Sequence, residues 1–248
     1  MATQCETLQI AVDDELIAAT LLEPKAKLPG VLFVHGWGGS QQRDLERARG
    51  LAGMGCICLS FDLRGHAETL AQQETVNREH SLRDLLAAYD RLLAHPHVDP
   101  SAVAVIGTSY GGYLSAILTS LRPVKWLALR VPALYRDEDW LVAKRKLDRE
   151  DLQRYRRTRV RPEENRALGA LAAFKGDVLI VESEHDDFVP HETIMSYRAA
   201  LQQTHSLTHR IIDGADHALS GELCQRAYTE VLTNWATEMI VGARLGER

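Results

Sequence analysis

A series of short, continuous apolar runs recurs along the chain and limits its fold more than any other feature. Such runs are typical of strands that are buried on both faces of a sheet. The runs are VLFVH (31–35), CICLSFD (56–62), VAVIG (103–107), WLALRV (126–131), VLIVES (178–183) and the weaker HRIID (209–213). Strands of this kind occur mainly in parallel sheets whose two faces are both covered.

Amphipathic helical patterns lie between and after these runs. Residues 82–93 and 228–239 each place their large apolar side chains on one stripe, with charged or polar side chains opposite. This spacing predicts helices that are half-buried against a sheet. Near the start of the chain, two apolar stretches within residues 6–24 flank Asp13 and Asp14, which predicts a β-hairpin. Together these patterns predict an α/β fold.

Length and composition favour a single globular domain over residues 1–248. The chain has 45% hydrophobic and 25% charged residues, a net charge of −5 and a pI of about 6.1. Because nucleic-acid binders usually carry a basic excess, we expect no nucleic-acid partner. No apolar run is long enough to span a bilayer, and the N-terminus has no secretory pattern. Oligomeric state cannot be inferred from the sequence.

Cysteine usage fits a reducing compartment. The four cysteines, at positions 5, 56, 58 and 224, form no C-x-x-C pair and no second cluster that could complete a zinc site. We therefore expect no metal and interpret Cys56 and Cys58 as small buried thiols. With no secretory pattern, the chain is expected to be cytoplasmic.

Residues 133–172 interrupt the alternation of strands and helices. The segment is densely charged, carries both signs and has no strand-like run. Its simplest interpretation is a solvated helical insertion. A second interpretation is a small helical cap over an active site, with Leu134, Tyr135 and Trp140 on its apolar underside.

The strongest chemical signal is Gly107-Thr108-Ser109-Tyr110-Gly111, a G-x-S-x-G sequence. The apolar run VAVI leads directly into it, and the helical pattern YLSAILTSL follows. Strand, tight turn and helix are the context of a nucleophile elbow, in which a strained turn exposes the serine hydroxyl. The sequence therefore predicts Ser109 as the nucleophile of a hydrolase.

A glycine-rich loop, His35 to Ser40, follows the first buried run. Ester hydrolysis places negative charge on the carbonyl oxygen, and two backbone N–H groups can stabilise it. We predict the N–H groups of Trp37 and Tyr110 as this oxyanion hole. His35 is interpreted as a structural residue that orders the loop. No G-x-x-x-x-G-K-[ST] motif is present, which excludes a nucleotide P-loop.

Two further segments supply an acid and a base. Asp186 and Asp187 follow the run VLIVES, and a carboxylate at a strand end can orient an imidazole. His217 follows the next run in Gly214-Ala215-Asp216-His217 and is predicted to be the general base. His66 and His80 are rivals, but neither follows the acid in the order Ser, Asp, His.

These motifs together resemble the α/β-hydrolase superfamily over nearly the whole chain, from VLFVHGWGG through FDLRGH, GTSYGG and EHDDFVP to GADH. The resemblance implies an eight-stranded, mostly parallel sheet with antiparallel first strands, and no cofactor. It also implies a triad of Ser109, His217 and Asp186, because the spacing S-x-x-D-x-x-V-P at 183–190 is similar to the acid loop of the family and selects Asp186.

The segment HPHVDPSAVAVIGTSYGGYLSA is most similar to the dienelactone hydrolase and prolyl oligopeptidase groups. Dienelactone hydrolases use a cysteine nucleophile where this chain has Ser109, and prolyl oligopeptidases carry a propeller domain for which 248 residues leave no room. We therefore expect a carboxylesterase-like serine hydrolase with a small-molecule acyl substrate. A thioesterase, a peptidase or amidase, a perhydrolase and a non-catalytic binding protein of the same fold remain alternatives. The substrate-binding residues are not identified.

Overall fold

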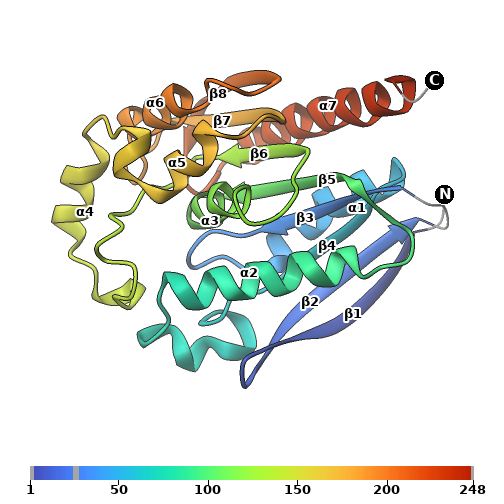
Figure 1. Cartoon of the computed structure of the whole chain (residues 1–248), viewed down its shortest axis with the longest axis horizontal. Helices are drawn as coiled ribbons and strands as arrows, with labels where there is room; N and C mark the ends of the chain where they lie inside the picture. The colour runs from blue at the N-terminus through green and yellow to red at the C-terminus, as the bar shows by residue number, and fades with distance from the viewer. Residues whose placement is uncertain (1–2, 25–27, 247–248) are drawn as a thin grey trace.

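One eight-stranded sheet forms the centre of the molecule (Figure 1), in a computed structural model that describes residues 3–24 and 28–246. Its strand order is β1-β2-β4-β3-β5-β6-β7-β8. The strands are β1 (Thr3–Val12), β2 (Glu15–Pro24), β3 (Leu28–Val34), β4 (Ile57–Phe61), β5 (Val98–Thr108), β6 (Trp126–Arg130), β7 (Asp177–His185) and β8 (Ser206–Asp216). Each apolar run of the sequence thus lies in or overlaps a strand, and the predicted α/β-hydrolase sheet is confirmed.

Pairing directions divide the sheet into two parts. β1 pairs antiparallel with β2 through a tight turn in which Asp13 has a φ of 53°, and β2 pairs antiparallel with β4. From β4 through β3, β5, β6 and β7 to β8, every pairing is parallel. Because parallel strands end at the same edge, the loops after β3, β5, β7 and β8 converge there. The predicted catalytic motifs all lie in these loops.

Successive side chains of the central strands enter two different cores. On β3, Leu32 and Val34 belong to one apolar cluster, whereas Val31 and Phe33 belong to the other. The first cluster is completed by α2 (Arg78–Leu93), α3 (Tyr110–Leu118), α5 (Arg166–Ala172) and α6 (His191–Ala200). The second is completed by α1 (Leu45–Gly53) and α7 (Glu222–Gly246). Burial of both strand faces explains why these runs have no polar alternation.

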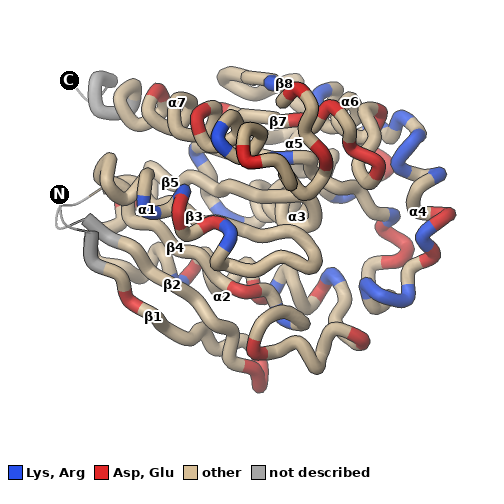
Figure 2. The backbone as a smooth tube through the Cα atoms, turned by 180° about the vertical axis from the view of Figure 1, so that it is seen from behind, with Lys and Arg blue, Asp and Glu red and all other residues tan. Residues whose placement is uncertain are grey.

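The segment between β6 and β7 contains short helices and no strand within the described residues. It comprises η3 (Lys144–Lys146), α4 (Arg149–Arg156), η4 (Pro162–Glu164) and α5. Two further 3₁₀ segments, η1 (Gln41–Arg43) and η2 (Ala67–Glu74), follow β3 and β4. Figure 2 shows basic and acidic residues of both signs along α4. Leu134 and Tyr135 are buried, and Trp140 is half-buried. That this segment acts as a cap stays a prediction.

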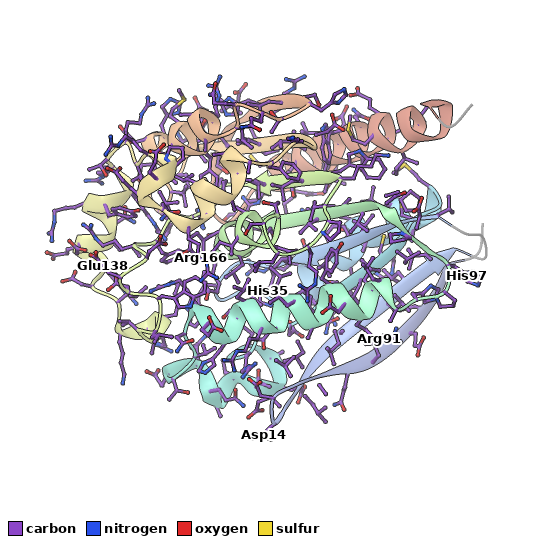
Figure 3. The ribbon with its side chains drawn as sticks, viewed as in Figure 1. Asp14, His35, Arg91, His97, Glu138 and Arg166 are labelled. Carbon is purple, nitrogen blue, oxygen red and sulfur yellow. The ribbon has the colours of Figure 1, made fainter. Side chains whose placement is uncertain are left out.

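Two labelled residues help to orient the molecule in Figure 3. His35 lies near its middle, after β3, and Asp14 lies at the tip of the β1–β2 hairpin. Within residues 3–24 and 28–246, no helix has the length and apolar character needed to cross a bilayer.

Candidate active site

Ser109 lies in a strained turn between β5 and α3. Its φ is 52° and its ψ −111°, a backbone conformation that non-glycine residues rarely adopt. The flanking glycines are needed for close packing. A Cβ on Gly111 would lie 2.2 Å from the carbonyl oxygen of Val34, and one on Gly107 would lie 2.6 Å from the Ser115 hydroxyl. The elbow therefore has the geometry that the G-x-S-x-G motif predicts.

The structure brings Ser109, His217 and Asp186 together from three loops. His217 Nε2 lies 3.0 Å from Ser109 Oγ, and His217 Nδ1 lies 2.6 Å from Asp186 Oδ2. An ionised carboxylate only accepts, so Nδ1 carries the proton and Nε2 is free to accept from the serine hydroxyl. This order of contacts permits transfer of a proton from Ser109 to His217.

Asp186 divides its two carboxylate oxygens between two tasks. Its Oδ1 accepts the backbone N–H groups of Phe188 and Val189, at 2.8 and 2.7 Å. Its Oδ2 remains to face His217. The neighbouring Asp187 is exposed. The S-x-x-D-x-x-V-P spacing reflects this geometry, since the N–H of Val189 is one of the groups that fix the carboxylate.

Two neutral histidines order the loop after β3. His35 Nε2 accepts the Leu63 N–H at 3.0 Å, and its Nδ1 donates to the Gly36 carbonyl at 2.8 Å. His66 Nε2 accepts the Gly38 N–H at 2.9 Å. Burial lowers the pKa of His35 to about 4 and also lowers the pKa of His66. Both imidazoles are therefore acceptors at neutral pH, and neither contacts Ser109 through a hydrogen bond in the described part of the chain.

The remaining rival, His80, belongs to the start of a helix. The Asn77 side chain caps α2 by accepting the His80 N–H at 3.0 Å, and His80 Nδ1 in turn accepts the Asn77 N–H at 3.4 Å. This reciprocal pairing is a capping box. His80 thus has a local structural partner.

Trp37 lines the same pocket as Ser109, and Tyr110 follows Ser109 directly in the chain; that their backbone N–H groups form an oxyanion hole stays a prediction. The Trp37 N–H donates to no atom of the described residues. Tyr110 is the first residue of α3, so its N–H lies outside the hydrogen-bond ladder of the helix. Their rings meet edge to face with centroids 5.6 Å apart, and the Lys144 ammonium lies over both rings. These contacts fix the two segments that carry the N–H groups.

A pocket of about 700 Å³ opens beside Ser109 and His217. Its far wall comes from η1, the first turn of α1, the end of β6 and the start of α7. This wall includes the side chains of Arg43, Asp44, Arg47, Arg130 and Tyr228. Sequence reasoning named none of them as site residues. Arg130 was visible as the one charge within the apolar run WLALRV, but the others carry no motif.

Asp44 is a buried carboxyl in this wall. Burial raises its pKa to about 6, although the nearby Arg47, with Nη1 3.6 Å from Oδ1, opposes that shift. Among residues 3–24 and 28–246 there is no cluster of three or more His, Cys, Asp or Glu side chains placed to hold a metal ion.

Comparison with known proteins assigns the family. Residues 44–242 match the prolyl oligopeptidase family. The chain belongs to the prolyl oligopeptidase family. It is also 26% identical over 219 residues to the uncharacterized protein Rv2307c of Mycobacterium tuberculosis. This alignment covers 86% of this chain and 71% of that protein. This prolyl oligopeptidase family member is accordingly a hydrolase of the α/β-hydrolase superfamily.

Solved structures share the fold of this prolyl oligopeptidase family member at low identity. Est1E from Butyrivibrio proteoclasticus, with ferulic acid bound, has a TM-score of 0.72 at 19% identity, over 94% of this chain and 99% of that chain. Dienelactone hydrolase from Anabaena variabilis has a TM-score of 0.68 at 21% identity, over 95% and 98%. Acylaminoacyl peptidase from Pyrococcus horikoshii has a TM-score of 0.70 at 16% identity, over 97% of this chain and 42% of that chain.

Proposed function

We propose that this protein is a serine hydrolase that cleaves a carboxylic ester through an acyl-enzyme intermediate. The observation that carries the proposal is the chain of hydrogen bonds from Asp186 through His217 to Ser109, beside an open pocket. A binding protein would not need a hydroxyl, an imidazole and a carboxylate in this order.

In the first half of the reaction, His217 Nε2 takes the proton from Ser109 Oγ as the oxygen attacks the carbonyl carbon of the ester. The carbonyl oxygen becomes negative and accepts the N–H groups of Trp37 and Tyr110. Asp186 stabilises the imidazolium and holds its orientation. His217 then gives the proton to the leaving oxygen, the carbon–oxygen bond breaks, and the alcohol departs.

In the second half, water takes the place of the alcohol. His217 removes a proton from the water, the hydroxide attacks the acyl carbon, and the bond to Ser109 breaks as His217 returns the proton to Oγ. The products are a carboxylic acid and the free enzyme. No cofactor is required for any of these steps.

Cleavage of an amide is the second candidate activity. The prolyl oligopeptidase family match and the similarity to acylaminoacyl peptidase favour it. The esterase Est1E, in contrast, is matched over 99% of its own chain, whereas the peptidase is matched over 42%. We therefore place the ester first. A thioesterase or perhydrolase would use the same groups.

The test compares Ser109→Ala with Ser101→Ala, which removes an exposed hydroxyl at the start of β5. Each variant is assayed on p-nitrophenyl esters of increasing chain length, acyl thioesters and aminoacyl p-nitroanilides. We expect ester turnover to fall by roughly four to six orders of magnitude in Ser109→Ala, since the nucleophile is lost. Ser101→Ala should keep the wild-type rate.

A fluorophosphonate probe adds a readout that does not depend on the substrate. We expect it to label the wild-type protein on Ser109 and to leave Ser109→Ala unlabelled. Full ester hydrolysis by Ser109→Ala would refute the nucleophile assignment. Faster p-nitroanilide than ester cleavage would make the protein a peptidase, and neither labelling nor turnover would make it a binding protein.

A further inference from the structure

The end of β6 clamps the backbone of the nucleophile from both sides. Arg130 lies beside Thr108 in the parallel pairing of β5 and β6, and its carbonyl oxygen accepts the Ser109 N–H at 2.9 Å. Three residues later, the Ala133 N–H donates to the Ser109 carbonyl oxygen at 3.0 Å. Between these contacts the chain turns through Val131, whose φ of 40° is unusual for a β-branched residue.

The side chain of Arg130 contacts the backbone of His217, the predicted general base. Its Nη1 and Nη2 both donate to the carbonyl oxygen of His217, at 3.1 and 3.0 Å. Arg130 therefore joins the backbone of the nucleophile, through its own carbonyl, to the backbone of the base, through its guanidinium.

The surroundings of Arg130 favour a role in joining these two backbones over a role in a salt bridge. The residue is 7% exposed, and no salt bridge to a carboxylate is found for it in the described part of the chain, although Asp186 and Asp44 lie near enough to act on its charge. The Tyr228 ring lies 5.7 Å from the guanidinium carbon and limits its movement. A buried guanidinium is costly unless its donors are used, and the His217 carbonyl uses two of them.

We propose that Arg130 is a positioning residue for the hydrolysis, which holds the imidazole of His217 in reach of Ser109 by fixing the His217 backbone. The proposal rests on the proposed function. Gly214, near the end of β8, has a φ of 68°, and residues 220–223 are exposed, so the bonds to the His217 carbonyl restrain the backbone between them. A displacement of about 1 Å between reacting groups can lower a rate about 100-fold.

Arg130 also lines the pocket, together with Arg43 and Arg47. This position suggests a different task, the binding of an anionic part of the substrate. The two tasks separate in steady-state kinetics. A residue that positions the base changes kcat, whereas a residue that binds substrate and transition state equally changes KM.

The experiment uses Arg130→Ala, Arg130→Lys and wild-type protein, with Ser109→Ala as the inactive reference. A neutral p-nitrophenyl ester is the substrate, so that no substrate charge depends on Arg130. For Arg130→Ala we expect kcat to fall by about 10- to 100-fold with KM within about threefold of wild type. Arg130→Lys should also lose kcat, because one ammonium cannot reproduce the planar pair of donors.

Chemical rescue provides a readout that a purely structural residue would not give. Because Arg130 lines an open pocket, guanidinium ion at millimolar concentration can enter the space left in Arg130→Ala and donate to the His217 carbonyl. We expect kcat of Arg130→Ala to rise severalfold with guanidinium and not with the same concentration of ammonium, while Arg130→Lys shows no rise.

The outcomes decide between the hypotheses. Wild-type kcat in Arg130→Ala or in Arg130→Lys would overturn the proposal, and so would a change confined to KM. If Arg130→Ala does not fold, a folded Arg130→Lys with reduced kcat and unchanged KM supports the proposal. Activity in Ser109→Ala would refute the proposed function itself, which makes the two failures distinguishable.

Discussion

His217 Nδ1 and Asp186 Oδ2 are 2.6 Å apart, and the other oxygen of the same carboxylate is held by two backbone N–H groups. The orientation of the Asp186 carboxylate is thus fixed by its own loop, independently of His217. Its side chain is 3% exposed, so little water competes for the imidazole proton. The adjacent Asp187 has no such environment, because it is exposed.

This difference makes Asp186→Asn and Asp187→Asn a matched pair. Asparagine at 186 can present its amide N–H to His217, which favours the wrong imidazole tautomer and removes the charge that stabilises the imidazolium. We expect ester kcat to fall by about 10²- to 10⁴-fold in Asp186→Asn. Asp187→Asn should keep its rate within about twofold. Equal losses in the two variants, measured with a p-nitrophenyl ester, would contradict the assignment of the acid.

The elbow gives a second matched pair. In Gly111→Ala, the new Cβ would lie 2.2 Å from the Val34 carbonyl oxygen, so β3 and α3 would have to separate. We expect a loss of about 3 kcal/mol or more in the free energy of unfolding, measured by urea denaturation. Gly50→Ala adds a Cβ in open space on α1 and should stabilise the protein by about 0.5–1 kcal/mol. Wild-type stability of Gly111→Ala would show that the packing is not required.

The strands and the chemical motifs were predictable because both depend on local sequence. VLFVH and VLIVES belong to strands whose two faces are both covered, which explains their continuous apolar character. GTSYG forms the elbow because only glycine fits at 107 and 111. Asp186 was preferred over Asp187 because the spacing S-x-x-D-x-x-V-P resembles the acid loop of the family, and in the structure this spacing places the Val189 N–H against Asp186. Each of these features is determined by residues that lie close together in the sequence.

The wall of the pocket was not predictable for the opposite reason. Arg47 and Tyr228 lie far apart in the sequence, and the Arg47 guanidinium lies over the Tyr228 ring only because α1 and α7 cover the same face of the sheet. The link between Arg130 and His217 likewise spans 87 positions. No local pattern encodes such contacts, because they depend on the order of strands and the packing of helices.

Asp44 predicts a pH effect on stability. Burial raises the pKa of this carboxyl from 3.8 to about 6, so the folded protein binds the proton more tightly than the unfolded chain does. Its contribution to stability is present below about pH 3.8 and is lost as the pH rises through 6, by about 3 kcal/mol in total. We expect Asp44→Asn to gain stability relative to wild type between pH 4 and pH 7.5. A difference between the two urea-unfolding curves that does not change with pH would contradict this.

His35 predicts an effect of the opposite sign. Burial and the neighbouring His66 lower its pKa from 6.5 to about 4, so the folded protein binds this proton less tightly than the unfolded chain does. Neutral His35 contributes fully to the free energy of unfolding above about pH 6.5. This contribution is lost as the pH falls through 4, by about 3 kcal/mol. Protonation would also end the acceptance of the Leu63 N–H by Nε2.

The pH dependence of stability that arises from His35 is best measured in Asp44→Asn, because this variant lacks the carboxyl whose pH effect has the opposite sign. We expect the free energy of unfolding of that variant to decrease steadily from pH 6.5 to pH 4.5. Adding His35→Asn should lower stability at pH 7 but make the decrease smaller, because the buried imidazole is gone and His66 remains. A titration of the His35 ring with a midpoint near pH 6.5 in NMR spectra, or an unchanged slope in the double variant, would show that the imidazole is not held neutral by burial.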